Sequence, residues 1–558
     1  MTMVTTPLPC TPQPAISLSS VKSRRPAPDS RPQFTQRSQR ILEILLVVGL
    51  TMLGFLAMGY HPGYEDDGVY LAAVKAQLNP ALFPHDAAFF RLQMQATLFD
   101  TGMAHFIRLT EMPVSWAELL WQWISLFLTL WASEKIARQI FGSGLVRWAG
   151  VATVGAMFTL PIAGTALNLM DQHLHPRNLA TALIMISVSQ VLAGKRWQPL
   201  SLMIVAALIH PIMAAFGLSF CGFLMLASRW MLAPREAGQR SFRSQWSTRV
   251  ASLAITSLPL RWVFEPPSDI WRKALDTRTY CFLNRWAWYE LVGAVAPLLI
   301  FWLLWRMGRK QGLTKLTCLT LAAMLFGIFQ LGVAILIQSV PSLIRLIPLQ
   351  PMRFLQLTYL FMLLLGGCLA GKYLLRSSWW RWALFLLLLY GGMFIAQRQL
   401  LDSSEHLELP GQQSANSWIQ TFTWIRQHTP SDAYFALDPK YLSAPGEDYH
   451  SFRALAERSQ LSDGIKDTAV VTQVPELGPL WQSQLAAQQG WAEFKLADFE
   501  RLRADWGVDW VVVAYPQTAG LDCVWRNRAL WVCRIPFNAR AAKAVPRQNS
   551  DLLSKLSR

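Results

Sequence analysis

The sequence predicts an α-helical polytopic membrane protein with about eleven membrane passes and a small extracytoplasmic α/β domain at its C-terminal end. Three observations support this fold class. Hydrophobic residues make up 53% of the 558 residues and charged residues only 15%, whereas soluble domains carry about 25% charged residues. The mean hydropathy is positive, at +0.26. Apolar stretches of the length that spans a bilayer recur between residues 41 and 400.

The first 40 residues contain six Lys or Arg residues against one acidic residue, Asp29, among many Pro, Ser and Thr. Such a segment cannot bury enough apolar surface to fold. We therefore expect a disordered basic tail in the cytoplasm, where it orients the first membrane span. An organellar transit peptide has a similar composition and is the alternative. A second disordered tail is expected over 541–558.

The membrane domain is predicted over 41–400. Its stretch 199–228 is interrupted by His210-Pro211, and Pro breaks the hydrogen bonding of a helix. We interpret the stretch as two short spans, because the basic cluster that follows belongs in the cytoplasm. The predicted spans are 41–60, 114–133, 146–165, 178–193, 199–209, 211–228, 249–264, 286–305, 316–340, 353–371 and 381–398.

The distribution of basic residues sets the predicted orientation. On this layout the cytoplasmic segments contain 23 Lys and Arg residues, whereas the outer loops 61–113, 166–177, 265–285 and 341–353 contain 10. Cytoplasmic loops are normally the more basic ones. The protein is therefore expected in a bacterial plasma membrane, with the N-terminus inside. The net charge of +17 reflects this bias, and no nucleic-acid partner is expected.

The region 401–540 has the composition of a soluble domain. A helix-like stretch over 415–427 and strand-like runs over 433–437 and 508–514 predict a small α/β fold outside the cytoplasm. Cys523 and Cys533 flank two short apolar runs around a turn near Arg528. A disulfide suits that geometry and an oxidising compartment. Two buried free thiols are the alternative.

Three consecutive carboxylates, Glu65, Asp66 and Asp67, open the long first outer loop. Carboxylates at this place can act as a general base on a hydroxyl group or bind a divalent cation. The alternative is capping of the following helix, for which one acidic residue suffices. Further along the loop, His85 and Asp86 are possible metal ligands, or else a turn with a capping Asp.

Other polar residues are expected at the outer interface. The second outer loop contains Asp171, His173, His175 and Arg177, which could hold a phosphate or a metal, or simply form a polar loop. His210 lies at membrane depth, where an ionisable residue is a functional candidate, although helix termination at Pro211 also explains it. Two arginines near the last outer loop are candidates for a lipid-linked phosphate or for contacts with lipid headgroups: Arg345 and Arg353.

Taken together, these short motifs resemble the GT-C superfamily of polytopic glycosyltransferases, and especially its uncharacterised bacterial members. No phosphate-binding Walker loop, Gly-x-Ser-x-Gly, His-Glu-x-x-His or kinase motif occurs. The resemblance extends over most of 41–535. It rests on Glu65-Asp66-Asp67, Leu82-Phe83-Pro84-His85-Asp86, His175-Pro176-Arg177, His210-Pro211, Leu349-Gln350-Pro351-Met352-Arg353, Trp424-Ile425-Arg426, Thr429-Pro430-Ser431-Asp432-Ala433, Phe452-Arg453 and Arg458.

The resemblance implies an inverting transfer of a sugar from a polyprenyl-phosphate carrier in the bilayer to an acceptor on the outer face, as part of cell-envelope chemistry. It gives the base or metal-ligand role to Glu65, Asp66 and Asp67, and the phosphate-binding role to Arg353. The expected substrate contacts also include Arg345, His175, Arg177 and His210. A divalent cation, Mg²⁺ or Mn²⁺, is expected with Asp66, Asp86 and His85 as ligands.

The acceptor is not defined, and the long signature motifs of oligosaccharyltransferases are missing. Two other classes of function stay open. A transporter would need polar residues along a central path, and few occur at mid-span besides His210 and Gln330. A non-catalytic assembly factor would use the region 401–540 for docking and would tolerate replacement of Glu65, Asp66 and Asp67.

Overall fold

The computed structural model describes residues 36–142, 144–195, 197–232, 265–514 and 519–536. Residues 1–35 of the predicted tail 1–40, the predicted tail 541–558 and the predicted span 249–264 lie outside these ranges. The prediction of disorder over 36–40 is wrong, because these residues form the start of the first helix. The chain divides into two compact units, Met1–Leu45 and Leu46–Arg558. The described part of the first unit is the start of helix α1 (Gln36–Met58), and everything below concerns the second unit.

Most predicted spans correspond to helices. Within the described residues, six helical segments are long and apolar enough to cross a membrane: Arg37–Met58, Pro211–Met231, Trp288–Lys310, Thr314–Ser339, Pro351–Leu375 and Trp379–Leu400. The number of passes stays a prediction, since other helices are shorter or more polar. The membrane-type helices after α1 are α5 (Val114–Phe141), α6 (Leu145–Ala156), α7 (Pro176–Leu192), α8 (Trp197–Ile209), α9 (Pro211–Leu232), α13 (Trp288–Lys310), α14 (Thr314–Ser339), α15 (Leu355–Ala370) and α16 (Trp379–Leu400).

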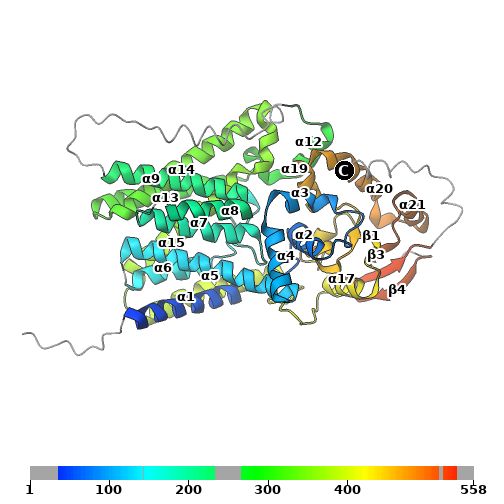
Figure 1. The fold of residues 1–558 in the computed structure, drawn as a ribbon, viewed down its shortest axis with the longest axis horizontal. Helices are drawn as coiled ribbons and strands as arrows, with labels where there is room; N and C mark the ends of the chain where they lie inside the picture. Colours follow the sequence, from blue (N-terminus) through cyan, green and yellow to red (C-terminus); the bar gives the residue numbers. More distant parts are fainter. Residues whose placement is uncertain (1–35, 143, 196, 233–264, 515–518, 537–558) are drawn as a thin grey trace, which may run out of the picture. The chain divides into compact units, whose positions relative to one another are not determined.

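These helices run side by side (Figure 1), and small residues allow some of them to approach closely. A Cβ atom on Gly150 of α6 would lie 2.6 Å from the carbonyl oxygen of Leu364 on α15, and one on Gly367 would lie 2.8 Å from that of Ala149. Both positions therefore require glycine. The interior of α5 is unusually polar for a span, because Glu134 is buried there in ion pairs with Arg138 and Arg147.

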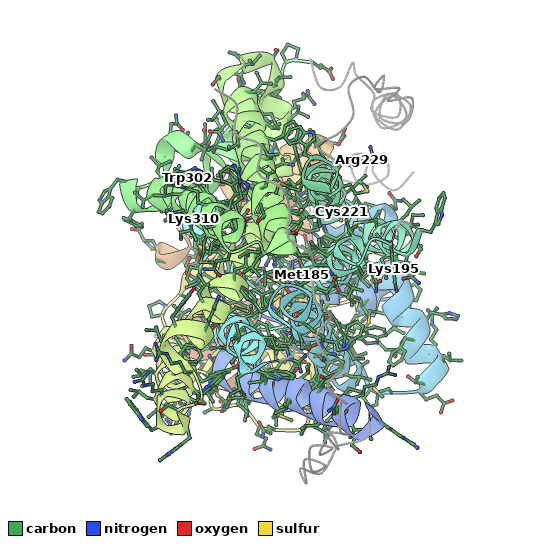
Figure 2. The ribbon with its side chains drawn as sticks, turned by 90° about the vertical axis from the view of Figure 1, so that its left-hand side faces the viewer. Met185, Lys195, Cys221, Arg229, Trp302 and Lys310 are labelled. Carbon is green, nitrogen blue, oxygen red and sulfur yellow. A yellow bond between two sulfur atoms is a disulfide. The ribbon has the colours of Figure 1, made fainter. Side chains whose placement is uncertain are left out.

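Short helices stand at one end of the bundle. The predicted first outer loop contains α2 (Asp67–Leu78), α3 (Ala88–Ala96) and α4 (Phe99–Thr110), and α12 (Asp269–Asp276) belongs to the same end. They lie beside the C-terminal region (Figure 1). The opposite end is basic: Lys195, Arg229 and Lys310 are exposed there, after α7 and in the last turns of α9 and α13 (Figure 2).

The C-terminal region is an α/β fold, as the sequence predicts. Its five strands are ordered β2-β1-β3-β5-β4, with β1 parallel to β2 and β3 and with the last two pairs antiparallel. The strands are β1 (Tyr434–Ala436), β2 (Ser459–Gln460), β3 (Trp510–Ala514), β4 (Asp522–Arg526) and β5 (Leu530–Arg534). The helices are α17 (Ser417–His428), α18 (Phe452–Ala456), α19 (Lys466–Gln473), α20 (Gly478–Ala487) and α21 (Leu496–Trp506). Cys523 and Cys533 face each other on β4 and β5 and form a disulfide.

Buried ion pairs join the first outer loop to this C-terminal region. Lys75 of α2 lies 2.7 Å from the Glu457 carboxylate. Arg453 of α18 donates to Asp86 at 2.5 Å and, through its terminal nitrogens, to both oxygens of Asp467 at 2.7 and 2.9 Å. Breaking a buried ion pair leaves an uncompensated charge and is strongly destabilising. These contacts therefore fix the loop and the C-terminal region to each other.

Candidate functional site

A cavity of about 520 Å³ lies where the short helices, the ends of the membrane-type helices and the C-terminal region meet. Its charged lining comes from segments that are far apart in the sequence. The acidic residues are Glu65, Asp66 and Asp171, and the cationic ones are Arg177, Arg278, Arg353 and Lys466. The structure therefore brings together five of the residues singled out in the sequence: Glu65, Asp66, Asp171, Arg177 and Arg353.

Glu65 is held in a strained backbone conformation at the cavity. Its φ angle is +46°, in the left-handed region that few non-glycine residues adopt and that often marks a functional site. Its N–H donates to the carbonyl of Tyr449 at 2.8 Å, and its carbonyl accepts a hydrogen bond from the Ser451 hydroxyl at 2.8 Å. The C-terminal region therefore determines where Glu65 points.

Asp66 follows immediately and is more tightly held. Its side chain makes no capping hydrogen bond to α2, so the capping alternative does not account for it. One carboxylate oxygen lies 2.9 Å from Lys466 Nζ and the other lies 3.6 Å from His175 Nε2. Because His175 Nδ1 accepts from the backbone N–H of Arg177, the ring carries its proton on Nε2, toward Asp66.

The two neighbouring carboxyl groups differ in their acidity. Burial raises the pKa of Glu65. The ammonium group of Lys466, 3.8 Å away, lowers this pKa in part, whereas the negative charge of Asp66 raises it further. Burial also acts on Asp66, but Lys466 and the hydrogen bond from His175 bring the pKa of Asp66 well below its usual value. Of the two, Glu65 is the better proton acceptor near neutral pH.

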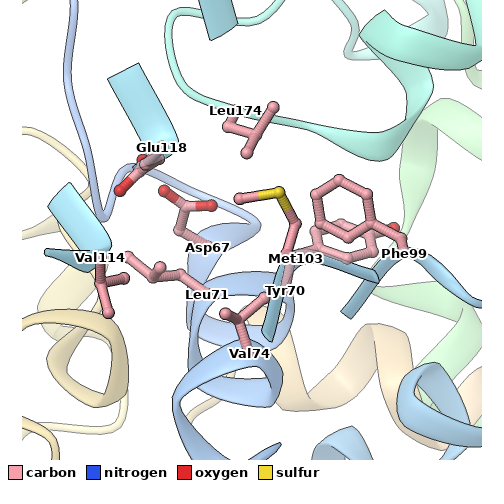
Figure 3. Close-up of a pocket in the computed structure, with 9 residues that line it drawn as sticks. All are labelled: Asp67, Tyr70, Leu71, Val74, Phe99, Met103, Val114, Glu118 and Leu174. Carbon is pink, nitrogen blue, oxygen red and sulfur yellow. The ribbon is translucent and has the colours of Figure 1, made fainter. Parts of the chain in front are cut away.

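Asp67 points away from the cavity, into the protein. Its carboxylate accepts the backbone N–H of Gly63 at 2.8 Å, and its side chain and that of Glu118 on α5 point toward each other (Figure 3). Burial and the facing carboxyl group of Glu118 raise the pKa of Asp67 well above its usual value. The three consecutive acidic residues Glu65, Asp66 and Asp67 are therefore divided between two environments.

Arg177 is the most deeply buried cation of the cavity, with its side chain 2% exposed. One terminal nitrogen donates to Asp171. Its Nε and its other terminal nitrogen are buried and have no hydrogen-bond partner among the described residues. Buried donors normally find a partner, so these two are well suited to an anionic ligand. Burial lowers the pKa of His173 in the same loop to about 3, so that ring is neutral.

Arg353 and Arg278 complete the cationic lining. Arg353 lies in the 3₁₀ turn before α15 and donates to the side chain of Gln350 at 2.5 Å. Arg278 follows α12 and its guanidinium stacks over the ring of Tyr280, which also lines the cavity. Apolar side chains cover other parts of the wall, including those of Leu167, Leu400, Ile465 and Val470. The cavity can therefore accept a ligand that is anionic at one place and apolar at another.

The sequence analysis did not identify Lys466 or Arg278. Both lie hundreds of residues from Glu65 in the sequence, and neither stands in a motif. Lys466 is the first residue of α19, and only the folded arrangement places it against the first loop. The adjacent Asp463-Gly464 turn gave a weak signal, since Asp463 accepts backbone N–H groups at the start of α19.

Other predicted site residues lie outside the cavity lining. Arg345 donates to the backbone carbonyl of Glu265 at 2.7 Å. His210 is buried at the start of α9, where its ring accepts the N–H of Met213. His210 therefore ends α8 and caps α9. This agrees with the alternative interpretation from the sequence, in which His210 belongs to a helix end before Pro211.

The predicted ligands of Mg²⁺ or Mn²⁺ do not come together. Asp86 is engaged by Arg453, and the ring of His85 stacks on Tyr434 with centroids 4.4 Å apart. At the cavity, an ammonium group, Lys466 Nζ, already lies between the carboxylates of Glu65 and Asp66. Since these cations bind through several oxygen ligands, the residues present do not fit such an ion there.

A different set of metal-ligating side chains does come together. The donor atoms of His61, Glu408 and His450 all lie within 4.8 Å of one another. The two imidazoles are fully buried, and the carboxylate side chain is 9% exposed. His61 of this buried cluster stands four residues before Glu65 in the first loop, and none of the three residues was predicted from the sequence.

Comparison with models of protein families gave no match, and comparison with curated proteins gave none. Among solved structures, the apo crystal structure of ArnT from Cupriavidus metallidurans matches with 11% identity and a TM-score of 0.40, over 92% of this chain and 100% of that one. The archaeal oligosaccharyltransferase AglB from Archaeoglobus fulgidus, in complex with an inhibitory peptide and a dolichol-phosphate, matches with 12% identity and a TM-score of 0.32, over 85% of this chain and 70% of that one. Both TM-scores lie below 0.5.

Proposed function

We propose that the protein is a membrane glycosyltransferase that moves a sugar from a polyprenyl-phosphate donor to an acceptor hydroxyl on the outer face of a bacterial plasma membrane. One observation carries the proposal: a single cavity combines three carboxylates, among them the unequal neighbours Glu65 and Asp66, with four cationic side chains and an apolar wall. Glycosyl transfer from a lipid phosphate needs a base, positive charge at the leaving phosphate and room for an apolar chain.

The donor phosphate is assigned to Arg177 and Arg353. Arg177 offers two buried donors that have no partner among the described residues, and its guanidinium fork suits phosphate oxygens. Arg353 lies at the start of α15, where a headgroup attached to a membrane-embedded chain can reach it. Arg278 adds positive charge to the same cavity.

Glu65 is the proposed general base. In the transfer step, the acceptor oxygen forms a bond with the anomeric carbon while the bond from that carbon to the phosphate oxygen breaks. The lipid phosphate leaves with the electron pair, and the hydroxyl proton moves to the Glu65 carboxylate. A single displacement of this kind inverts the anomeric configuration. Asp66 is a positioning residue, because it holds Lys466 and His175 beside Glu65.

The orientation of the bundle supports an outer-face reaction. Exposed cations gather at the end of the helices away from the short helices of the site, as Lys195, Arg229 and Lys310 illustrate (Figure 2). The cytoplasmic end of membrane proteins is normally the more basic one. The cavity then lies on the extracytoplasmic side, together with the region 401–540.

The test is a transfer assay with purified full-length protein in lipid nanodiscs and a bacterial lipid extract whose polyprenyl-phosphate sugars carry a radiolabel. With a bacterial envelope extract added as the source of acceptor hydroxyls, we expect the wild type to release label from the polyprenyl-phosphate sugars onto an acceptor and the Glu65→Gln variant to lose this activity. Glu476→Gln, the same change at an exposed carboxylate of the C-terminal region, is the matched control. Equal release by the wild type and by a triple Ala variant at Glu65, Asp66 and Asp67 would favour an assembly factor.

A further inference from the structure

The buried cluster has a hydrogen-bonding pattern that needs a positive charge. His450 Nδ1 lies 3.1 Å from the backbone carbonyl of Glu447, which can only accept, so Nδ1 carries a hydrogen. His450 Nε2 lies 3.1 Å from both oxygens of Glu408. A lone pair on Nε2 would repel that carboxylate. The ring is therefore either an imidazolium or the ligand of a cation that sits between the two groups.

The geometry is close to that of a metal centre. His61 Nδ1 lies 2.9 Å from Glu408 Oε1, and His450 Nε2 lies 3.1 Å from the same atom. Zinc binds nitrogen and oxygen ligands at about 2.0–2.2 Å, which places neighbouring ligand atoms of a tetrahedron roughly 3.3 Å apart. Both of these pairs lie within about 0.4 Å of that spacing, and all three donor atoms lie within 4.8 Å of one another, so side-chain movements can bring them around one ion.

The surroundings follow the usual pattern for a ligating histidine. Such a histidine donates its second ring nitrogen to a carbonyl or carboxylate, which fixes the orientation of the ring. His450 does so through Nδ1 and the Glu447 carbonyl. Two imidazoles and one carboxylate favour a borderline transition metal over Mg²⁺ or Ca²⁺, which prefer oxygen ligands.

We propose that His61, Glu408 and His450 form a binding site for one divalent transition-metal ion of the zinc type. The site joins three chain segments that are already paired through their backbones. Tyr60 pairs with Leu407, and Tyr64 pairs with His450. The ion fastens the first loop, immediately before Glu65, to the C-terminal region. Metal binding at this site does not depend on the proposed glycosyl transfer.

The experiment measures metal content and thermal stability of untagged full-length protein in nanodiscs. After treatment with EDTA and removal of the chelator, one sample receives ZnSO₄ and another MgSO₄, and unbound metal is removed. We expect about one zinc ion per chain by inductively coupled plasma mass spectrometry, no retained magnesium, and a higher melting temperature with zinc only.

Three variants locate the ion. His61→Gln and His450→Gln are expected to weaken zinc binding by more than about 100-fold, since changes beyond the ligands already cost roughly 10- to 100-fold. His406→Gln is the matched control, because His406 lies on the same segment as Glu408 but bonds the Leu56 carbonyl. Size-exclusion profiles identify misfolded variants, and Glu408→Gln replaces any that misfold.

Absence of stoichiometric zinc in the wild type, or equal zinc in all variants, would overturn the proposal. Zinc content and melting temperature are measured without the transfer assay, so this test is separate from that of the proposed function.

Discussion

Two charged clusters include residues of the first loop, and they differ in how many opposite charges surround each carboxylate and in how exposed the carboxylates are. In the cavity cluster of Glu65, Asp66 and Lys466, one ammonium faces two carboxylates whose side chains are each 38% exposed. In the buried cluster of His61, Glu408 and His450, two imidazole rings contact one carboxylate, and all three side chains are almost completely buried. An unevenly matched and accessible carboxylate can exchange a proton with a substrate, whereas a closed cluster fixes the chain. The same loop thus combines a reactive face with a structural one.

The largest effect is expected when both carboxylates of the cavity cluster are neutralised. The double variant Glu65→Gln/Asp66→Asn removes the proposed base and releases Lys466 and His175. We expect transfer to fall by at least the hundred- to ten-thousand-fold that loss of a general base typically costs, while expression and membrane insertion are unchanged. Initial rates in the labelled-lipid assay measure this. Transfer within tenfold of the wild type would show that the cavity cluster is not the reactive face.

A smaller effect is expected from Arg353→Ala. This change removes the proposed charge-assisted contact to the donor phosphate, and such a contact is worth roughly 1.5–3 kcal/mol. The KM for the lipid donor should rise by about 10- to 150-fold with little change in kcat. Titration of the donor at a fixed acceptor concentration separates the two constants. A fall in kcat at unchanged KM would instead place Arg353 in the chemical step.

The single variant Asp66→Asn is expected to shift the pH profile. Glu65 must be ionised to act as a base, so the transfer rate rises with pH through its raised pKa. Asp66 contributes to that raised pKa through its negative charge. Its removal should therefore move the acidic limb of the kcat profile to lower pH. Asp432→Asn, at an exposed position, should leave the limb in place, and a limb that moves to higher pH would contradict the assignment.

The smallest effect is expected at Asp67, the last of the three consecutive acidic residues. Asp67 faces Glu118 inside the protein, and burial and that carboxyl group raise its pKa well above its usual value, which favours its protonated form. Because Asn has nearly the same shape as a protonated Asp, Asp67→Asn should change kcat/KM within about twofold, the equivalent of ~0.5 kcal/mol. A loss as large as that of the double variant would mean that Asp67 also belongs to the reactive face.

The fold class was predictable because it depends on composition and on the lengths of apolar stretches. The α/β character of the C-terminal region and the pairing of Cys523 with Cys533 also followed from local patterns of strands and a turn. The different positions of Glu65, Asp66 and Asp67 could not be predicted in this way. A step of one residue along the chain decides whether a side chain faces the cavity or Glu118. Lys466 was equally out of reach, because an isolated Lys in a soluble segment gives no signal until the fold places it against Asp66.

The central claim is that Glu65 acts in the chemical step and not in donor binding. Single-turnover transfer, with protein in excess over labelled donor and with acceptor added by rapid mixing, tests it most directly. For Glu65→Gln we predict that donor binding stays within about threefold of the wild type, while the transfer rate falls by about a hundred- to ten-thousand-fold. An unchanged single-turnover rate, or a loss confined to donor binding, would contradict the assignment of Glu65 as the base.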